Sequence, residues 1–555
     1  RRLDRRRGSR PRRHGVDRLM TKGVISAPQP EAVEAGALAL KRGGNAIDAA
    51  ITCALVQGVV DPMMCSIAGV GTLQVYMPDQ GVHDCLNFTG KAPAAARPDM
   101  WEDLIEGEAT DGFGFRLRGR VNEMGYQSVA IPGSLKAYFE VATRYGKMDW
   151  ADIVQPSIDY AEKGWTVRPH VYKNIARHDS GFGRIDNLTK IRAFQSSRAL
   201  LLAEDGTPHG PGTEIVNQNY AQTLRTIASD GADAFYYGAI AEEIANEMER
   251  HGGLITLEDL KAVTPTRSKP LWGTYRGQKL STNPPPGAGM VLLEMLNILE
   301  HFDLVSMGHN APSYIQVITE TIKYGIIDKA THMGDPAYVD IPTELLIGKD
   351  HAAPFAKKIK AGEKAHVERM PLSKESKDTT QVSVMDENGN AITMTHTLGM
   401  PSGVISENLG FMYNGSMGIF DPRPGRAGSI APGKGYTSSM TPTIVFKNDA
   451  PHIVIGAPGA THITLGIMQV LLNILEFGMP ISDAIAAPRF SVTSNIIDVS
   501  NRIPSYLTDE VEAMGYEVRR SSESYGFAGV HGVMNHDGVL SGAADPGRDG
   551  MALVV

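Results

Sequence analysis

The sequence predicts an α+β protein, and three observations support that fold class. Its 555 residues, 42% hydrophobic and 21% charged, suit an ordinary globular protein that is too long for one simple core. Apolar residues recur at helical spacing through much of the first two thirds. From Thr379 onwards the pattern changes to alternating strands separated by glycine and asparagine turns, and this is the sharpest change in composition along the chain.

The N-terminal part reads as a strand, two helices and a hairpin. A short apolar strand is expected at 24–26, and an amphipathic helix at 31–41 that ends at a Gly-Gly-Asn sequence. Residues 46–60 are almost entirely apolar and predict a buried helix. The segments 73–76 and 81–88 are expected to pair as a hairpin.

The middle of the chain, from about 130 to 370, is predicted to be mainly helical. The expected helices include 134–145, 150–163, 239–251 and 289–301, and the three prolines before Gly287 predict a rigid loop ahead of the last of them. Residues 345–378 contain few large apolar side chains, so a weakly structured connector is expected there.

Charge and cysteine content exclude several classes of protein. The net charge of −8 gives no reason to expect nucleic-acid binding by the main body. Residues 1–19 are rich in arginine and are expected to be a disordered basic arm or upstream sequence, with Met20 as the start. No apolar run is long enough for a membrane helix, so no membrane partner is expected and the cytoplasm is the default location. The three cysteines, Cys53, Cys65 and Cys85, lack metal-ligand spacing and are expected to be reduced and buried.

One hairpin carries the candidate chemistry. Two alternating runs between Thr379 and Leu398 flank an Asn-Gly pair, which is the strongest short-range hairpin signal. A two-residue turn at Asn388-Gly389 would place Thr380 opposite Thr397, with Thr379 within one pair of it. Threonine is a favoured strand residue, so this pattern alone indicates only a polar sheet face.

A series of motifs changes that interpretation. In chain order they are GGNAIDAAI (43–51), AIPGS (130–134), NPPP (283–286), DTTQVSVMDENGNA (378–391), SSMTPTIV (438–445), GAPGATHI (456–463) and ADPGRDG (544–550). In number, order and spacing they resemble the gamma-glutamyltranspeptidase family, and the likeness runs from about Gly23 to the C-terminus.

This resemblance implies a four-layer αββα sandwich of the N-terminal-nucleophile hydrolase type. It also implies an inactive precursor that cuts itself between Asp378 and Thr379 into a large segment, 20–378, and a small segment, 379–555, interleaved in one fold. The threonine hydroxyl needs a base, which in this class is the α-amine that cleavage releases. The family works on small-molecule amides, including those of glutathione metabolism, without cofactor or metal. The sequence leaves open whether the processed chains assemble into a homo-oligomer.

The resemblance also implies catalytic and substrate-binding roles for further residues. Thr397 matches the threonine that orients the nucleophile. Gly459 and Ala460 match the segment whose N–H groups form the oxyanion hole, where the family usually has two glycines. The local pattern agrees, because a strand at 452–455 leads through a tight turn into a helix at 461–475. Ser438 and Ser439 match the serine pair that contacts the substrate.

The positions that hold a glutamyl headgroup depart from the family pattern. The arginine that binds the α-carboxylate falls on Thr89, and the asparagine, glutamine and aspartate that bind the α-amine fall on Gly399, Ser416 and Ile419. Leaving a desolvated charge without its partner costs a few kcal/mol. We therefore expect a smaller or less zwitterionic amide than glutathione. The candidate replacement cations are Lys91, Arg97, Arg423 and Arg426.

Three other functions compete with this one. Residues 428–435 nearly fit a phosphate-binding loop, but the final hydroxyl residue is replaced by Gly435. A serine hydrolase is indicated weakly by Ser416, which lacks the first glycine of GxSxG, and His396, His462, His531 and His536 have no metal-ligand spacing. A catalytically weak or inactive homologue that acts as a binding protein is the remaining alternative.

Overall fold

The computed structural model describes residues 22–109, 114–177, 183–368 and 379–555. The arginine-rich segment, predicted to be a disordered arm, and Asp378, predicted to precede the cleavage site, lie outside these ranges. Within them, no helix is long and apolar enough to cross a membrane. Cys53, Cys65 and Cys85 are all buried free thiols, as predicted.

Two antiparallel sheets form the centre of the molecule. The first has seven strands in the order β22 (Met551–Val554), β1 (Gly23–Ala27), β11 (Thr380–Asp386), β12 (Ala391–Thr397), β2 (Val70–Met77), β3 (Val82–Phe88) and β8 (Thr266–Ser268). The second has six, in the order β21 (Val539–Ala544), β20 (His531–His536), β16 (Ala450–Gly456), β15 (Thr443–Lys447), β10 (Gln278–Thr282) and β9 (Leu271–Tyr275). Each sheet combines strands from before and after Thr379, so the two predicted segments are interleaved.

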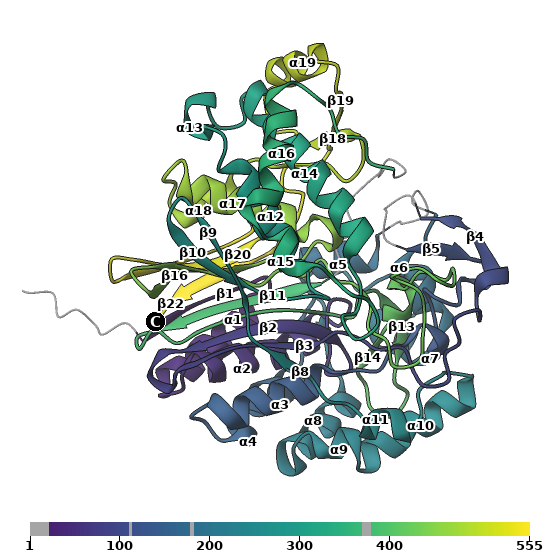
Figure 1. Ribbon diagram of the computed structural model, residues 1–555. Helices are drawn as coiled ribbons and strands as arrows, with labels where there is room; N and C mark the ends of the chain where they lie inside the picture. Colours follow the sequence, from purple (N-terminus) through teal and green to yellow (C-terminus); the bar gives the residue numbers. More distant parts are fainter. Residues whose placement is uncertain (1–21, 110–113, 178–182, 369–378) are drawn as a thin grey trace, which may run out of the picture.

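Helices cover the outer face of each sheet, which gives the predicted αββα sandwich (Figure 1). The first sheet is covered by α1 (Pro30–Lys41) and α2 (Ala46–Val60), backed by α3 (Ser134–Tyr145), α4 (Trp150–Lys163) and α8 (Gln218–Asp230). The second is covered by α12 (Gly289–Leu299), α17 (Ile463–Leu475) and α18 (Ile481–Ala486), with α14 (Pro312–His332) and α16 (Lys349–Lys360) packed outside α12. Every residue of α2 and α12 is buried, which explains why apolar residues occur on all sides of these helices.

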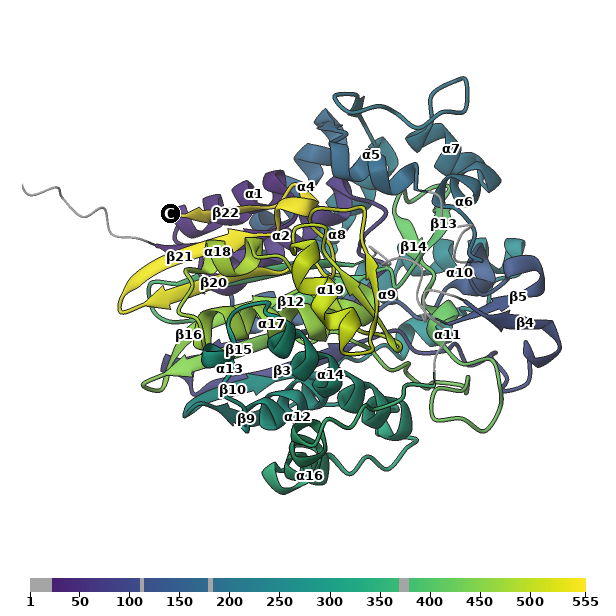
Figure 2. The same cartoon turned by 90° about the horizontal axis from the view of Figure 1, so that it is seen from above.

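Smaller elements extend the sandwich at its edges (Figure 2). They are β4 (Ile105–Glu108), β5 (Phe115–Leu117), β6 (Trp165–Thr166), α5 (Pro169–Ile175), α6 (Asn187–Ala193), α7 (Gln195–Leu201), β7 (Glu214–Ile215), α9 (Asp233–Tyr236), α10 (Ala239–His251), α11 (Leu257–Lys261), α13 (Leu304–Met307), α15 (Thr343–Leu346), β13 (Pro401–Ile405), β14 (Met412–Asn414), β17 (Phe490–Ser491), β18 (Ile496–Val499), α19 (Ser505–Ala513) and β19 (Glu517–Arg520).

The threonine face of β12 is buried between the two sheets. Thr395 Oγ1 donates to the Gln381 side-chain oxygen at 2.6 Å, and Gln381 Nε2 donates to Thr393 Oγ1 at 2.8 Å. Thr393 Oγ1 in turn donates to the carbonyl of Ile455 in the second sheet at 3.1 Å. Because buried polar groups need partners, this chain of side-chain hydrogen bonds fixes the first sheet against the second near the start of β11.

Most predicted elements are confirmed, but the predicted connector at 345–378 is wrong in its first half. Residues 349–360 form helix α16, whose buried Ala352, Ala356 and Ile359 share one face. That face is built mainly from alanine, so it carries little hydrophobic signal in the sequence although it packs well against α12 and α14. Helix α12 also ends at Leu299, two residues before the predicted end.

Candidate active site

The hairpin formed by β11 and β12 places two threonines side by side. Its strand register differs by one residue from the predicted register. Thr380 pairs with His396, not with Thr397. The turn has three residues because the Asp386 carboxylate accepts from the backbone N–H groups of Asn388 and Asn390 and closes the loop. Gly389 takes the positive φ of 76° that such a loop requires. Continued by one residue, this register places Thr379 directly opposite Thr397.

Thr379 is held in an unusual backbone conformation immediately before β11. Its φ is +98°, in a region that a β-branched residue rarely adopts, so the backbone is strained at this position. The side chain is buried, and its hydroxyl donates to Thr397 Oγ1 at 3.1 Å. Thr397 Oγ1 also accepts from the backbone N–H of Gly399 at 2.9 Å. The two hydroxyls are thus fixed relative to each other by the sheet and by the chain that follows it.

A tight turn between β16 and α17 lies against the same site. Gly459 has a φ of +136° and Ala460 a φ of +48°, so both residues lie in the left-handed half of backbone space. The carbonyl of Pro458 accepts from Gly529 and that of Gly459 from His462, which fixes the turn. No described residue accepts a hydrogen bond from the N–H groups of Gly459 and Ala460. Such groups before a buried helix are suited to binding an oxyanion.

The serine pair is positioned by the proline-rich loop and by helix α14. The backbone N–H of Ser438 donates to the carbonyl of Pro286 at 2.8 Å. Asn283 Nδ2 donates to the carbonyl of Met440 at 3.0 Å, two residues further on. Lys329, on α14, donates from Nζ to Ser439 Oγ at 2.5 Å. Sequence reasoning did not find Lys329, because it belongs to no motif and lies in a long helix more than one hundred residues before the serines.

One pocket joins these pieces. Its lining is Thr379, Thr397, Gly399, Ile419, Tyr436, Thr437, Ser438, Ser439, Met440, Ala460 and Ile463. The pocket therefore brings together the predicted nucleophile, its orienting threonine, one member of the predicted oxyanion turn and both serines. None of these lining residues is histidine, cysteine or an acid. The pocket thus presents threonine and serine hydroxyls and no histidine, cysteine, aspartate or glutamate side chain.

The predicted headgroup positions divide between this pocket and its surroundings. Gly399 and Ile419 line the pocket and offer no charge. Ser416 is fully buried behind Gly399 and donates to the carbonyl of Leu398 at 3.2 Å. Thr89 lines an adjoining cleft together with Lys91. The structure thus places no charged side chain at any of the four positions.

The candidate replacement cations are placed unevenly. Lys91 lines the adjoining cleft. Arg97 is exposed beside Asp99, at 3.4 Å. Arg423 forms an ion pair with Asp421 at 2.6 Å, and its guanidinium lies over the ring of Phe115. Arg426 does not line either pocket. Two cations outside the candidate set contact residues that line the threonine pocket: Lys329 at Ser439 Oγ and Arg548 at the carbonyl of Thr379.

His396 and His462 have structural surroundings. His396 is fully buried and bonds the hydroxyl of Tyr138 at 2.6 Å and the side-chain oxygen of Gln57 at 2.8 Å. Burial lowers the pKa of His396 to about 3, so the ring is neutral at physiological pH. His462 bonds Ser491 at 2.5 Å. No histidine faces Ser416 in the described contacts, and residues 428–440 contain no helix, so neither the serine-hydrolase nor the phosphate-loop interpretation is supported.

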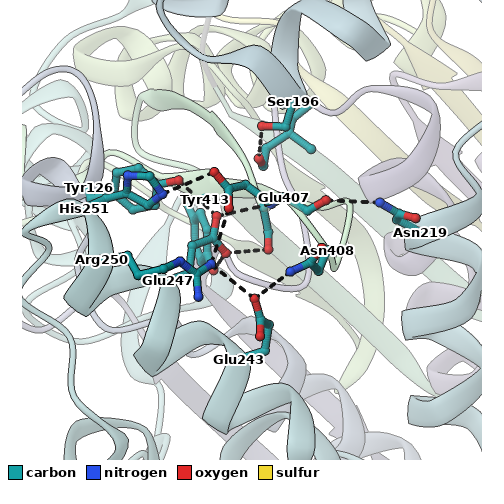
Figure 3. Close-up of polar contacts among 12 residues, drawn as sticks. Tyr126, Ser196, Asn219, Glu243, Glu247, Arg250, His251, Glu407, Asn408 and Tyr413 are labelled. Atoms are coloured by element: carbon teal, nitrogen blue, oxygen red, sulfur yellow. Dashed lines mark hydrogen bonds and ion pairs between the residues drawn. The ribbon is translucent and has the colours of Figure 1, made fainter.

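A buried carboxylate anchors the chain that leaves the site. After Gly399 the chain forms the hairpin of β13 and β14, and its connecting loop packs on α10 (Figure 3). Glu247 of α10 is fully buried and accepts hydrogen bonds from Ser406 Oγ at 2.6 Å, the Tyr413 hydroxyl at 2.9 Å and the Tyr126 hydroxyl at 3.0 Å. This network joins the two predicted segments.

Comparisons with known proteins agree with this geometry. The family model described as Gamma-glutamyltranspeptidase matches residues 32–555. The chain is 33% identical to the Acylase ACY 1 proenzyme of a Pseudomonas species, over 96% of this chain and 94% of that protein. It is 30% identical to the Glutathione hydrolase proenzyme of Escherichia coli, over 94% of this chain and 90% of that protein. The solved cephalosporin acylase from Bacillus halodurans superposes with a TM-score of 0.83 at 26% identity and covers 99% of both chains.

Proposed function

The chain belongs to the gamma-glutamyltranspeptidase family, and from that premise we propose that it is a self-processing amidohydrolase or acyltransferase with Thr379 as its nucleophile. The observation that carries the proposal is the 3.1 Å hydrogen bond between the Thr379 and Thr397 hydroxyls, in a pocket that Ala460 also lines. The homologues are named as proenzymes, which favours the active enzyme over the inactive binding protein.

Processing is the first reaction in this proposal. Thr379 Oγ attacks the carbonyl carbon of Asp378, the peptide C–N bond breaks, and the nitrogen takes up the proton that Oγ releases and becomes the new α-amine. Water then hydrolyses the resulting ester and leaves a carboxylate on Asp378. The positive φ of Thr379 supports this step, because cleavage detaches the preceding carbonyl group, whose position relative to the Thr379 side chain causes the strain.

Turnover uses the same hydroxyl. The α-amine of Thr379 accepts its proton as the oxygen attacks the amide carbon of the substrate. In this proposal the N–H groups of Gly459 and Ala460 stabilise the developing oxyanion. Collapse breaks the amide C–N bond, the leaving amine takes the proton from the α-ammonium, and the acyl group remains as an ester on Thr379. Water or an amine acceptor completes the cycle.

The lining of the pocket supports an acyl group with a carboxylate end and no α-ammonium group. Gly399, Ser416 and Ile419 supply no negative charge to hold an ammonium ion. On the other wall, Lys329 is bonded to Ser439 and brings a cation to the serine pair. The monoamide of a small dicarboxylic acid therefore fits better than a γ-glutamyl amide. The relatives named as acylases are consistent with this choice.

Mass spectrometry of the purified protein under denaturing conditions tests the reaction class. The wild type is expected to give two fragments, the smaller one starting at Thr379, and Thr379→Ala a single intact chain without turnover. A Thr379→Ser variant should still process and turn over, more slowly. Intact wild type after long incubation, without turnover, would instead support the binding-protein alternative.

A panel of p-nitroanilides with matched chain length tests the substrate. The glutaryl derivative carries the carboxylate alone, the γ-glutamyl derivative carries carboxylate and amine, and the valeryl derivative carries neither. The expected order of kcat/KM is glutaryl first by at least about tenfold, equal to about 1.4 kcal/mol of transition-state binding. Preference for the γ-glutamyl compound would overturn the substrate assignment but leave the nucleophile in place.

A further inference from the structure

Three side chains from three helices converge outside the catalytic pocket. Glu294 comes from α12, Asp328 from α14 and His351 from the first turn of α16. One ligand atom from each lies within 4.8 Å of the other two. The residues are far apart in the sequence, so no spacing motif indicates the cluster.

Glu294 distinguishes this cluster from an ordinary surface group of acids. Its side chain is fully buried, no N–H or O–H donor of the described residues reaches either carboxylate oxygen, and the Asp328 carboxyl group lies within hydrogen-bond reach. Asp328 is 9% exposed, and its Oδ2 lies 2.6 Å from His351 Nε2. No described lysine or arginine forms an ion pair with Glu294 or Asp328. A buried carboxylate without a partner is costly, which calls for a cation or a proton at this place.

We propose that Glu294, Asp328 and His351 bind a divalent transition metal ion, with zinc as the ion to test first. Two carboxylates and one imidazole neutralise a divalent charge and form a ligand set that suits Zn²⁺ or Mn²⁺. Ligands at about 2.1 Å from a tetrahedral metal lie about 3.4 Å from one another. The present spacing therefore needs only small side-chain movements, with His351 and Asp328 moving slightly apart and water completing the coordination.

The surroundings hold the ligands in place. Asn297, one turn after Glu294 on α12, donates to the carbonyl of Ile347 at 2.7 Å, just before α16. Lys349 Nζ, two residues before His351, donates to the carbonyl of Thr274 on β9 at 2.9 Å. His351 itself packs edge-on against Phe355 and remains partly exposed, which leaves a route for an ion to enter.

The role that fits this position is structural. Asp328 is adjacent to Lys329, which reaches Ser439 in the wall of the threonine pocket. Helix α12, which carries Glu294, follows the proline-rich loop that binds Ser438. An ion joining α12, α14 and α16 would therefore stiffen this wall of the pocket from behind, without contact with the reacting atoms.

Metal content, measured on untagged full-length protein, tests the proposal. After treatment with a chelator and titration with zinc chloride, wild type is expected to bind one tight Zn²⁺ per chain by calorimetry and elemental analysis. Its Tm should rise by about 3 °C or more. Glu294→Gln, which is nearly isosteric, and His351→Ala should each weaken binding by at least about 100-fold and remove the Tm shift.

The control is Glu344→Gln, because Glu344 is an exposed carboxylate on neighbouring α15. It should bind zinc as the wild type does. If Glu294→Gln does not fold, the partly exposed His351→Ala variant decides the question alone. A wild type that binds zinc no better than His351→Ala would overturn the proposal and show that the cluster holds only a proton. Burial and the neighbouring Asp328 raise the pKa of Glu294 well above its ordinary value, which is consistent with that outcome.

Discussion

Arg548 Nη1 donates a hydrogen bond to the main-chain carbonyl oxygen of Thr379 at 3.2 Å, from a guanidinium that is almost fully buried. The interaction joins the start of β11 to the turn between β21 and β22, near the end of the chain. In the proposed mechanism, this permanent positive charge lies beside the residue whose α-amine, once released by cleavage, must be neutral to act as a base.

Removal of that charge should change the pH dependence of turnover. A cation disfavours a second positive charge nearby, so Arg548 favours the neutral form of the amine. In Arg548→Gln the acid limb of the kcat/KM profile should move to higher pH by about one unit. Arg548→Lys keeps the charge and should leave the limb in place. An unchanged profile for the glutamine variant would show that Arg548 acts only on structure.

Thr397 is expected to matter for catalysis more than for stability. Thr397→Val keeps the shape of the side chain but removes the hydroxyl that accepts from Thr379 and Gly399. We expect kcat to fall by about 100-fold, because a misplaced nucleophile loses that order of rate. Thr397→Ser should recover most of it.

Thr395→Val is the matched control for that experiment, since Thr395 lies two residues earlier on the same strand and bonds Gln381 between the sheets. It should lower stability by about 1 kcal/mol in denaturant titration and leave kcat nearly unchanged. Equal losses of kcat in both variants would contradict the specific role of Thr397.

Ala460→Gly should stabilise the protein slightly without a loss of activity. The φ of +48° costs alanine about 1–2 kcal/mol, and glycine avoids that cost but loses part of the gain to its more flexible unfolded state. A net gain of about 0.5–1 kcal/mol is expected in chemical denaturation. Gly459→Ala, at a φ of +136°, should instead lower both stability and kcat. Similar behaviour of the two variants would argue against a strained turn.

The lost headgroup charges should be partly restorable. Thr89→Arg with Ile419→Asp adds a cation and an anion at the positions where the family resemblance places them. A γ-glutamyl p-nitroanilide should gain about tenfold in kcat/KM relative to the glutaryl compound. Gly399 is left unchanged, because a Cβ there would lie 2.4 Å from Ser416 Oγ. The control replaces Thr89→Arg by Thr89→Lys, which adds the positive charge but not the planar guanidinium group that can bind a carboxylate through two hydrogen bonds. No change in the substrate ratio would refute the assignment of these positions.

His396 should make the protein sensitive to acid. Its native pKa of about 3 lies below the ordinary value near 6.5, so the native state binds fewer protons than the unfolded state between these values. Its contribution to stability is therefore complete above pH 6.5 and is lost as the pH falls towards 3. From pH 7 to 5 the free energy of unfolding should fall by about 2 kcal/mol on this account.

Urea denaturation at the two pH values measures this effect. His396→Gln should be less stable than the wild type at pH 7, yet lose less stability on acidification. His301→Gln, at an exposed histidine, should show the wild-type loss. An identical pH dependence in all three proteins would contradict the buried neutral ring.

Local patterns predicted much of the fold because their causes are local. Helices 134–145, 150–163 and 239–251 have the predicted bounds, since an amphipathic stripe and its terminal residues depend only on neighbours in the chain. Helix 349–360 was missed because its buried face is mostly alanine and becomes hydrophobic contact only when α12 and α14 pack on it. The hairpin register was off by one, because the Asp386 side chain selects a three-residue turn.

By itself, the sequence determined the family, the sandwich and the pair Thr379 and Thr397, because ordered motifs and strand alternation record them along the chain. The tertiary structure decided what surrounds that pair. Arg548, Lys329 and Ala460 come from separate elements, and only the packing of the two sheets and their helices brings them to one place. The same holds for Glu294, Asp328 and His351, whose three helices meet in space but leave no regular spacing in the sequence.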